Sequence, residues 1–358
     1  YMQTLRATGT KRRMGICYAT SKDGIHWTKP LMDIRRWDDE QPTNIVDIGP
    51  HGSGIMKDLR DEDPQRRYTM FMKEKGVSVE FSPDGMHWSN PIRCPEIDAA
   101  ADTHNNAVWA PELECYVGIT RLWSNNPRQR VVGRTESPDF IHWTKGVEVF
   151  RGDPARQIYA MPVFRYADVY IGLPVIFQPE TDRSHTELAW SSDTVNWHRI
   201  DPGTPLIPTS SNREAYDWGC VYGAACPIVR DNEIRIYYGA SNGPHTDWRD
   251  GFLALATLRP DGFAGYESVD VGKPSVVVTS LVSVVGDTLR ITADAAGGSI
   301  RATAIDAAGN ELATSQPIAD DVTDRPVVFP KGFTLSGQGN SIRLRFELDS
   351  AKLHAFSL

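Results

Sequence analysis

A seven-residue phrase that occurs four times constrains the fold of this chain more than any other feature. Each copy begins with Ser, has Asp at its third position and ends with Trp. The copies occupy residues 21–27, 82–88, 137–143 and 191–197, and a degenerate fifth copy lies at residues 260–263. The spacing of about 55 to 60 residues indicates one supersecondary unit that is repeated five times.

The chemistry of the phrase is that of a tight turn. Ser and Asp side chains accept backbone hydrogen bonds, and the Gly that follows Asp in two copies adopts a positive φ at low cost. An alternating or apolar run precedes the turns, for example at residues 14–20, 77–81 and 186–190, and this pattern predicts a strand. We expect each phrase to be a hairpin tip between two outer strands, packed down by its Trp. The less favoured alternative is that the phrase contacts a ligand. Five such units predict an all-β fold, a five-bladed β-propeller.

Most strands of this propeller can be placed between the turns. We expect strands of blades two to five at residues 51–58, 68–72, 77–81, 102–109, 116–121, 130–135, 157–164, 169–177, 185–190, 217–225, 234–240 and 252–257. Blade one has candidates for its second and third strands, at residues 1–5 and 14–20, but none for its innermost strand. Either the amino end is truncated or another segment closes the ring, and the lack of an initiating Met favours truncation.

The composition changes after about residue 270. Residues 269–358 lack Trp and are rich in Ala, Val, Gly and Thr. Expected strands at residues 275–285, 288–293, 300–306 and 342–348, separated by Gly-containing turns, predict an antiparallel β-sandwich. We therefore assign residues 1–268 to the propeller and residues 269–358 to an accessory β-sandwich domain, which either has a packing role or binds carbohydrate.

Charge and cysteine content exclude several classes of function. The net charge is −8 with both signs interspersed, which argues against a nucleic-acid partner. No apolar run reaches the roughly 18 residues that a membrane helix needs, and no signal peptide is evident. The five Cys show neither CxxC nor Cys/His spacing, so neither a disulfide framework nor a zinc site is indicated. Localisation stays open: secreted or periplasmic if a signal peptide has been removed, cytoplasmic otherwise.

The phrases, the five-fold period and the trailing sandwich resemble the five-bladed propeller glycoside hydrolases, the superfamily that contains families 32, 43, 68, 117 and 130. Residues 101–106 and 238–245 are similar to segments of bacterial relatives of families 32 and 43. The chain lacks the Trp-Met-Asn-Asp-Pro-Asn signature and the Arg-Asp-Pro and Glu-Cys-Pro triplets that fructan-acting members carry. Sialidases are less similar, because their turn motif places Gly and Trp one position later and their propellers have six blades.

The resemblance implies a substrate funnel lined by the starts of the innermost strands and by loops between second and third strands. Hydrolysis there commonly uses two carboxyl groups, about 5 Å apart for retention and about 6.5–9.5 Å apart for inversion. Asp102 and Asp217 head the first strands of blades three and five and form the leading catalytic pair. Glu187 lies in an apolar segment, where burial would raise its pKa and suit a general acid. Its alternative is a buried structural carboxylate paired with an Arg.

Other polar residues are expected on the same rim and would bind sugar hydroxyls. These substrate-binding candidates are His51, His104, Asn105, Gln157, Tyr159, His245, Asp247, Trp248 and Arg249. Trp248 could stack on a sugar face, and Arg249 could hold a carboxylate or sulfate. The acidic run at residues 58–63 is expected at the opposite end of the axis, as a solvated turn.

We therefore expect a glycoside hydrolase that acts on a glycan or oligosaccharide through Asp102, Asp217 and Glu187. The alternatives are a non-catalytic carbohydrate-binding propeller, and a glycoside phosphorylase in which a basic cluster takes over the task of one carboxylate. No cofactor or metal is demanded, since no loop has EF-hand spacing; an axial calcium, as in some family 43 relatives, would leave no mark in the sequence. The expected partner is a carbohydrate, not nucleic acid or membrane, and the oligomeric state is open.

Overall fold

The computed structural model describes residues 2–6, 12–36, 42–247, 249–270 and 272–358. Its elements are β-strands together with two short 3-10 helices, η1 (Pro64–Arg66) and η2 (Ser336–Gln338), so the described chain is all-β. No helix in these ranges is long and apolar enough to cross a membrane. The chain divides into two compact units, Tyr1–Pro227 with Ile236–Ala256 and Ile228–Arg235 with Thr257–Leu358.

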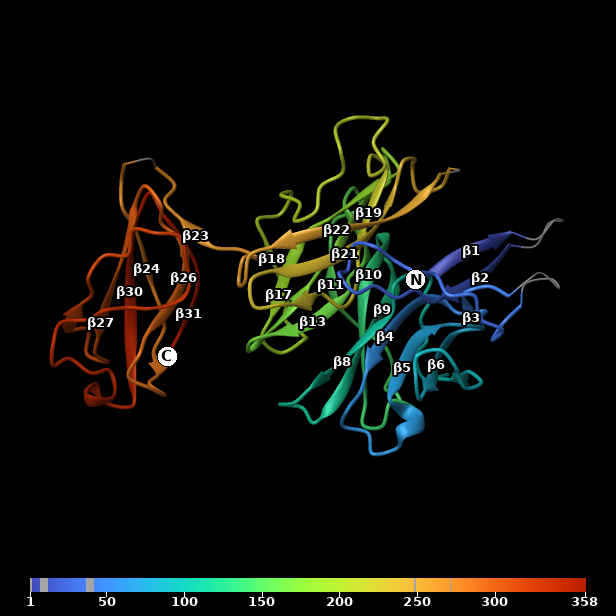
Figure 1. The fold of residues 1–358 in the computed structure, drawn as a ribbon, viewed down its shortest axis with the longest axis horizontal. Coiled ribbons are helices and arrows are strands. Elements are labelled where there is room, and N and C mark those ends of the chain that lie inside the picture. The colour runs from blue at the N-terminus through green and yellow to red at the C-terminus, as the bar shows by residue number, and fades with distance from the viewer. Residues whose placement is uncertain (1, 7–11, 37–41, 248, 271) are drawn as a thin grey trace. The chain divides into compact units, whose positions relative to one another are not determined.

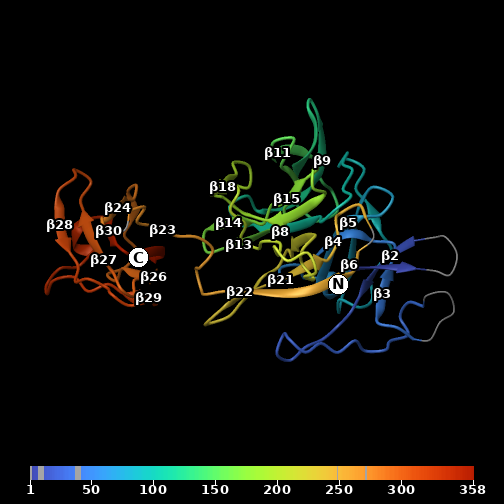
Figure 2. The same cartoon turned by 90° about the horizontal axis from the view of Figure 1, so that it is seen from above.

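Antiparallel sheets follow one another along the first unit (Figures 1 and 2). The first sheet has the order β1 (Met2–Arg6), β2 (Arg12–Cys17), β3 (Ile45–Ile48). The second has the order β4 (His51–Lys57), β5 (Tyr68–Lys73), β6 (Val77–Ser82), β7 (Ile92–Arg93). The third has the order β8 (Asn106–Ala110), β9 (Cys115–Asn125), β10 (Arg128–Ser137), β11 (Val147–Arg151).

The fourth sheet is divided in two. One half has the order β12 (Gln157–Ala160), β15 (Val175–Gln178), β16 (Arg183–Thr186). The other has the order β13 (Val163–Tyr166), β14 (Val169–Gly172), β17 (Leu188–Ser191), β18 (His198–Ile200). A single parallel pairing links β16 to the fifth sheet, which contains β19 (Cys220–Gly223), β21 (Ile234–Ser241), β20 (Ile228–Val229) and β22 (Gly251–Leu258).

Every strand predicted in the first unit overlaps an observed strand, with two corrections at strand starts. Strand β8 begins at Asn106 and β19 begins at Cys220, so Asp102 and Asp217 lie in loops ahead of these strands and not at their heads. The three predicted strands of the fourth sheet are also interrupted, two of them at Pro162 and Pro174 and the third at Glu187. The interruptions at the two prolines have a physical reason, because Pro has no N–H to donate to the ladder.

The repeated phrase forms hairpin tips between the third and fourth strands of the second, third and fourth sheets, as predicted. In one copy Asp84 Oδ1 accepts from the backbone N–H groups of Met86 (2.8 Å) and His87 (2.9 Å), and Gly85 has φ +77°. Phe140 and Thr194 hold the matching positions in copies without Gly, also at positive φ. The side chain of His87 bonds to the carboxylate of Asp84 at 2.7 Å, so this His has a structural role in the turn.

The tryptophan that ends each phrase packs against the preceding sheet. The ring of Trp143 lies 4.8 Å from that of Phe71 in β5. Trp88 is buried in a cluster that includes residues of β2 and β3, and the ring of Trp197 lies 6.5 Å from that of Phe150 in β11. Trp27, from the hairpin of the first sheet, lies 5.6 Å from Tyr237 in β21. Contacts therefore run from each of these sheets to the one before it, and from the first sheet to the fifth.

The second unit consists of two antiparallel sheets. One has the order β23 (Tyr266–Glu267), β31 (Lys352–Ser357), β26 (Arg290–Asp294), β29 (Val322–Pro326). The other has the order β24 (Ser275–Val278), β30 (Ser341–Asp349), β27 (Ser299–Ile305), β28 (Glu311–Thr314), with β25 (Val282–Ser283) also pairing with β30. The pairing of β23 with β31 shows that residues before 269 already contribute to these sheets. Strands β23, β28, β29 and β31 were not predicted.

One hydrophobic core joins the two sheets of the second unit. Strand β30 alternates between buried and partly exposed positions, so that Leu344 and Phe346 point to the same side and are fully buried. They share a core with Ile291 of β26 and Leu353 of β31.

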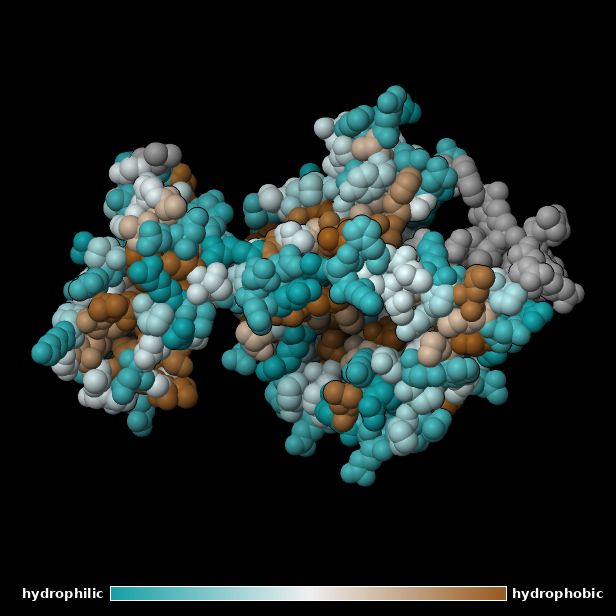
Figure 3. All heavy atoms as spheres, viewed as in Figure 1, coloured by the Kyte–Doolittle hydropathy of each residue, from teal (hydrophilic) through white to brown (hydrophobic). Residues whose placement is uncertain are grey.

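On the face shown in Figure 3 hydrophilic side chains predominate and apolar ones are scattered among them. No disulfide bond joins any of the five Cys, which all lie within the described ranges.

We predict that Gly118→Ala in β9 destabilises the protein by about 1–3 kcal/mol through overpacking. A Cβ at this position would lie 2.8 Å from Trp143 Cζ3 and 2.9 Å from Thr135 Cγ2, so the tryptophan that joins the second and third sheets would have to move. The matched control is Gly239→Ala, because a Cβ there meets no atom within 4 Å. Urea unfolding of both variants is the measurement, and equal stability of the two would contradict the importance of this packing.

Candidate functional site

A cluster of charged side chains surrounds Asp102 in the first unit. Asp102 Oδ1 lies 3.2 Å from Lys73 Nζ and 3.3 Å from His51 Nε2, and Asp102 Oδ2 lies 3.0 Å from Arg121 Nη2. The Asp102 side chain is 52 % exposed, whereas that of Arg121 is 4 % exposed. Solvent or a ligand can therefore reach the Asp102 carboxylate, which is ion-paired with Lys73 and Arg121.

Strand register explains why these groups meet. His51 and Lys73 are direct partners across the β4–β5 ladder, so their side chains leave the same face of the second sheet. Arg121 comes from β9 of the third sheet, and Asp102 comes from the loop that leads into β8. The Asp102 cluster, defined as these four residues, is therefore assembled at the junction of the second and third sheets.

The loop that carries Asp102 is fastened to β4 by close backbone packing. A Cβ on Gly52 would lie 2.3 Å from the carbonyl oxygen of Thr103, and one on Gly54 would lie 2.2 Å from that of Asn105. The Asn105 side-chain amide donates to the carbonyl oxygens of Gly52 (2.8 Å) and Ala101 (3.0 Å). Only Gly permits this approach, because any larger residue would push the loop away from β4. The position of Asp102 relative to His51 therefore depends on this close packing of the loop against β4.

An aromatic wall adjoins the cluster. The guanidinium carbon of Arg121 lies 5.0 Å from the ring centre of Tyr159, and that of Arg130 lies 5.4 Å from the same ring. The Tyr159 hydroxyl lies 2.9 Å from His245 Nε2. Tyr222 lies 5.8 Å from Tyr159, centre to centre. Aromatic faces beside hydrogen-bonding groups suit a sugar ring, which has apolar faces and a polar rim.

Three histidines in and beside the cluster have depressed basicity. Burial lowers the pKa of His104 to about 4, with a smaller effect from His51. Burial also lowers the pKa of His51, against the opposing pull of Asp102. The pKa of His245 falls mainly through burial and then through Arg249. At neutral pH all three imidazoles are therefore neutral and can both donate and accept hydrogen bonds.

Asp102 itself is held in its charged form. Partial burial acts to raise the pKa of Asp102, but the hydrogen bond and charge of Lys73 and the charge of Arg121 outweigh burial and lower it. An ionised, accessible carboxylate can accept a proton or stabilise positive charge. It does not store a proton for donation at neutral pH.

Glu187 does not serve as the general acid that its sequence context suggested. It is completely buried, accepts from Arg199 Nε at 3.0 Å and lies 3.1 Å from His185 Nε2. Burial acts to raise its pKa, yet the hydrogen bonds from His185 and Arg199 outweigh it, so the pKa is lowered instead of raised. The structural alternative, a buried carboxylate paired with Arg, is the one observed.

Within the described residues, no hydrogen bond or ion pair connects Asp217 to the Asp102 cluster. It lies half-buried in the turn ahead of β19, and its charge acts on Tyr238. The expected carboxylate pair therefore reduces to Asp102.

The remaining predicted contacts have different outcomes. His51, His104, Tyr159 and His245 lie in or beside the cluster, as described above. Asn105 is fully buried with its amide bonded to backbone carbonyls, so we correct its assignment from a substrate contact to a structural residue. Trp248 lies outside the described residues.

Gln157 and Arg249 hold other parts of the site in place. Gln157 Oε1 accepts from Arg130 Nη1 at 2.9 Å, so Gln157 orients an arginine. Arg249 Nη1 donates to the carbonyl oxygens of Pro244 and Asp247, and also to that of His245, which corrects its expected role of holding a carboxylate to one of shaping its own loop. Asp247 lies exposed in that loop.

Sequence reasoning missed Lys73, Arg121, Arg130 and Tyr222. Arg130 and Arg121 fall inside predicted strands, and Lys73 directly follows one. Regular register would not have found Lys73, because a hairpin continued from the Lys57–Tyr68 pair places Lys73 opposite Gly52; a shift in register between His51 and Gly54 brings it opposite His51. No sequence signal places Arg121 and Arg130 on Tyr159 of the next sheet.

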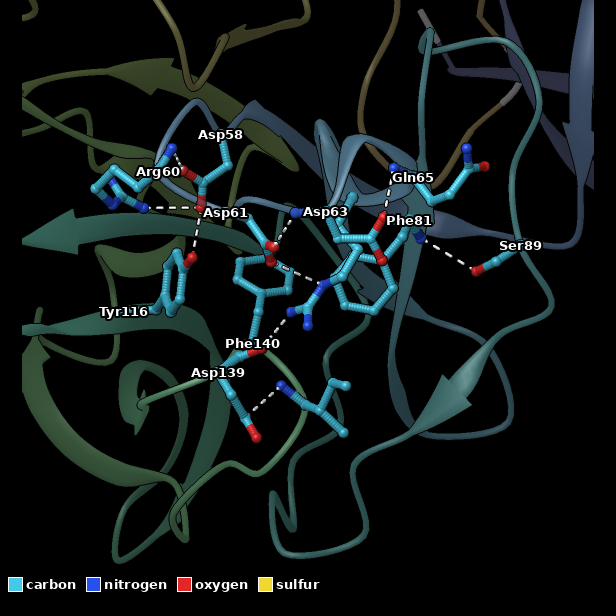
Figure 4. A network of polar contacts seen from close by, with 12 residues as sticks. Asp58, Arg60, Asp61, Asp63, Gln65, Phe81, Ser89, Tyr116, Asp139 and Phe140 are labelled. Carbon is cyan, nitrogen blue, oxygen red and sulfur yellow. Dashed lines mark hydrogen bonds and ion pairs between the residues drawn. The ribbon is translucent and has the colours of Figure 1, made fainter.

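The acidic run at residues 58–63 is structural, and only part of it is solvated (Figure 4). Asp58 is buried, bonds to Arg60 at 2.8 Å and accepts from the hydroxyl of Tyr116. Asp61 Oδ2 lies 2.9 Å from Arg66 Nε, and Arg66 in turn donates to the carbonyl oxygen of Asp139. These contacts fix η1 against the neighbouring turn.

A pair of buried carboxyl groups lies between the first and second sheets. Glu80 in β6 is 1 % exposed and Asp47 in β3 is 7 % exposed. Burial, and then the adjacent Asp47, raise the pKa of Glu80 to about 9. A carboxyl that stays protonated at neutral pH can share its proton with Asp47, which avoids two buried charges.

No group of three or more His, Cys, Asp or Glu side chains within the described ranges is placed to hold a metal ion.

Comparisons with known proteins reveal relationships only at the level of structure. The sequence matches no protein-family model and no curated protein. A solved structure of a BT0996 RGII complex is similar over 71 % of this chain and 81 % of its own length, with 19 % identity and a TM-score of 0.51. Another, described as a "Glycoside hydrolase", covers 72 % of this chain and 86 % of its own, with 16 % identity and a TM-score of 0.49.

A third similar structure comes from work headed "The GH130 family of mannoside phosphorylases contains glycoside hydrolases that target beta-1,2 mannosidic linkages in Candida mannan". It matches 70 % of this chain and 76 % of its own, with 14 % identity and a TM-score of 0.44. The likeness to the BT0996 structure shows a common fold.

We predict that Glu187→Gln destabilises the protein by about 3–5 kcal/mol at neutral pH, because it leaves Arg199 buried without its counter-charge. The folded-state pKa of Glu187 is lowered, so its contribution is present above the ordinary value of 4.5 and is lost as the pH falls through the folded value. The stability difference between wild type and variant should therefore shrink in acid. Thermal unfolding at several pH values measures it, with Asp217→Asn as the control that changes little.

Proposed function

We propose that this chain is a glycan-acting enzyme, a glycoside hydrolase, with Asp102 as its central catalytic residue. The observation that carries the proposal is that Asp102 is accessible, ionised and surrounded by donors from Lys73, His51 and Arg121. Beside it stands the aromatic face of Tyr159. A carboxylate next to an aromatic surface and several fixed donors suits both the binding of a sugar and the transfer of a proton.

The proposed scaffold is a five-bladed β-propeller followed by a β-sandwich. The turn tryptophans support five blades, since they link successive sheets and Trp27 contacts Tyr237 of the fifth. Two sheets around one core in the second unit support the sandwich. The predicted domains are residues 1–268 and 269–358; we propose a boundary ahead of Tyr266 instead, because Tyr266–Glu267 pairs with β31 of the sandwich sheets.

Asp102 would act as a general base in this enzyme. Because the pKa of Asp102 is lowered, its carboxylate is free to take a proton from a water molecule that attacks the anomeric carbon. The leaving oxygen must receive a proton, and the hydroxyl of Tyr159, hydrogen-bonded to His245, is the donor that we propose. Arg121 contacts both Asp102 and Tyr159, so it would hold these groups in one site.

We predict that Asp102→Asn lowers turnover by about 10²–10⁴-fold, the usual effect of removing a positioned base. The measurement is hydrolysis of a panel of aryl glycosides and of plant and microbial oligosaccharides. Asp217→Asn is the matched control, because it removes a carboxylate outside the Asp102 cluster, and it should retain turnover. Sugar binding without turnover by the wild type would instead favour a carbohydrate-binding propeller.

We predict that Lys73→Met moves the acid limb of the pH–activity profile to higher pH. Lys73 lowers the pKa of Asp102, so a variant without this charge protonates Asp102 at a higher pH. A base is active only when ionised; activity should therefore fall earlier as the pH is lowered. An activity that rises on acidification would show that Asp102 donates a proton, and would overturn its assignment as the base.

A further inference from the structure

Two arginines of the third sheet lie together without enough negative charge to balance them. Arg121 faces Val132 across the β9–β10 ladder, and Arg130 is two residues from Val132, so both side chains leave the same face of the sheet. Both guanidinium groups lie beside the ring of Tyr159, at 5.0 and 5.4 Å. Two cations are thus held at one aromatic ring.

The surroundings of Arg130 are apolar or neutral. Its guanidinium carbon lies 4.8 Å from the ring centre of Phe177 and 4.9 Å from that of Trp123, and its hydrogen-bond acceptor is the neutral amide of Gln157. Burial, and then the charge of Arg121, lower the pKa of Arg130. A half-buried guanidinium in such a setting lacks a counter-charge.

The charge of Asp102 acts on Arg130, but neither Asp102 nor Asp182 bonds to Arg130 within the described structure, and both carboxylates are engaged elsewhere. Asp102 faces two cations already, Lys73 and Arg121. Asp182 accepts from the backbone N–H and hydroxyl of Thr246, at 2.7 and 2.5 Å. In addition, the Nε atoms of both Arg121 and Arg130 are buried without a hydrogen-bond partner, and the Arg121 side chain is 4 % exposed. Placing two buried guanidinium groups next to each other costs free energy unless an anion binds between them.

We propose that Arg121 and Arg130 form a subsite for an oxyanion beside Asp102. Guanidinium groups bind carboxylate and phosphate oxygens through charge-assisted hydrogen bonds, often in pairs. Two sources share this chemistry: the carboxylate of an acidic sugar, such as a uronic acid, and free inorganic phosphate. The inference rests on the proposed function, because it places the anion in a sugar substrate or beside one.

The test measures binding, which does not require turnover. The ligands are methyl glucuronide and methyl galacturonide, the neutral methyl glucoside and galactoside, and sodium phosphate, titrated into the intact protein at constant ionic strength. We expect at least one anionic ligand to bind more tightly than the neutral sugars. Arg130→Met should weaken this binding by about tenfold or more, and Arg130→Lys less, since it keeps the charge but not the planar fork.

Arg128→Met is the matched control, because Arg128 lies exposed on the same strand with its guanidinium carbon 5.0 Å from the ring of Trp123. It should leave anion binding unchanged. If Arg130→Met does not fold, Gln157→Glu provides a second route, since a carboxylate at the Gln157 position would occupy Arg130 and compete with the ligand. Loss of anion binding in that variant, with retained unfolding temperature, supports the subsite.

The outcomes separate the sources and the two proposals. Binding of the uronides alone assigns the anion to the sugar, and binding of phosphate alone assigns it to free phosphate. Anion binding that persists in an Asp102→Asn variant supports the subsite whether or not any glycoside is cleaved. Neutral sugars that bind as tightly as the uronides, with no phosphate binding, overturn the subsite even if a neutral glycoside is hydrolysed.

Discussion

The packing of each turn tryptophan onto the preceding sheet is the interaction on which the first unit depends. A hairpin of this size buries too little apolar area to stand alone, and an indole ring that bridges two sheets supplies area to both. Trp143 illustrates it: its ring lies 4.8 Å from Phe71 of the second sheet, and it is almost wholly buried. Gly118 belongs to the same sheet as Trp143, so the missing side chain there makes room for the indole ring between the third sheet and Phe71 of the second.

The Asp102 cluster is a consequence of that arrangement. Its members come from separate sheets, and no local segment could assemble them. His51 and Lys73 reach Asp102 because they are paired on one face of the second sheet. Arg121 reaches it from the third sheet. The glycines of β4 let the loop that carries Asp102 pack closely against this strand. A small shift of the second sheet would therefore also move the Asp102 carboxylate.

The electrostatic character of the site follows from unequal burial. Asp102 is half-exposed but faces cations, so it stays ionised. The three imidazoles are neutral because burial penalises their charged forms. Arg121 and Arg130 keep their charge beside aromatic rings. These differences are the basis for the proposed base, Asp102, and for the proposed oxyanion subsite beside it.

The sequence by itself determined the repeat, the hairpin tips, most strands and the composition break, because turn residues, period-two alternation and a fixed spacing are local features of the chain. It also led to Asp102, since strand starts and the loops before them meet at one end of such a fold. Only the tertiary structure decided which charges face one another. Glu187 and Arg199 are a buried pair, although the apolar segment around Glu187 suggested a raised pKa. Arg121 and Arg130 enter the site through contacts with the next sheet. Protonation and accessibility depend on distances between segments far apart in the chain, so they could not be predicted from local sequence.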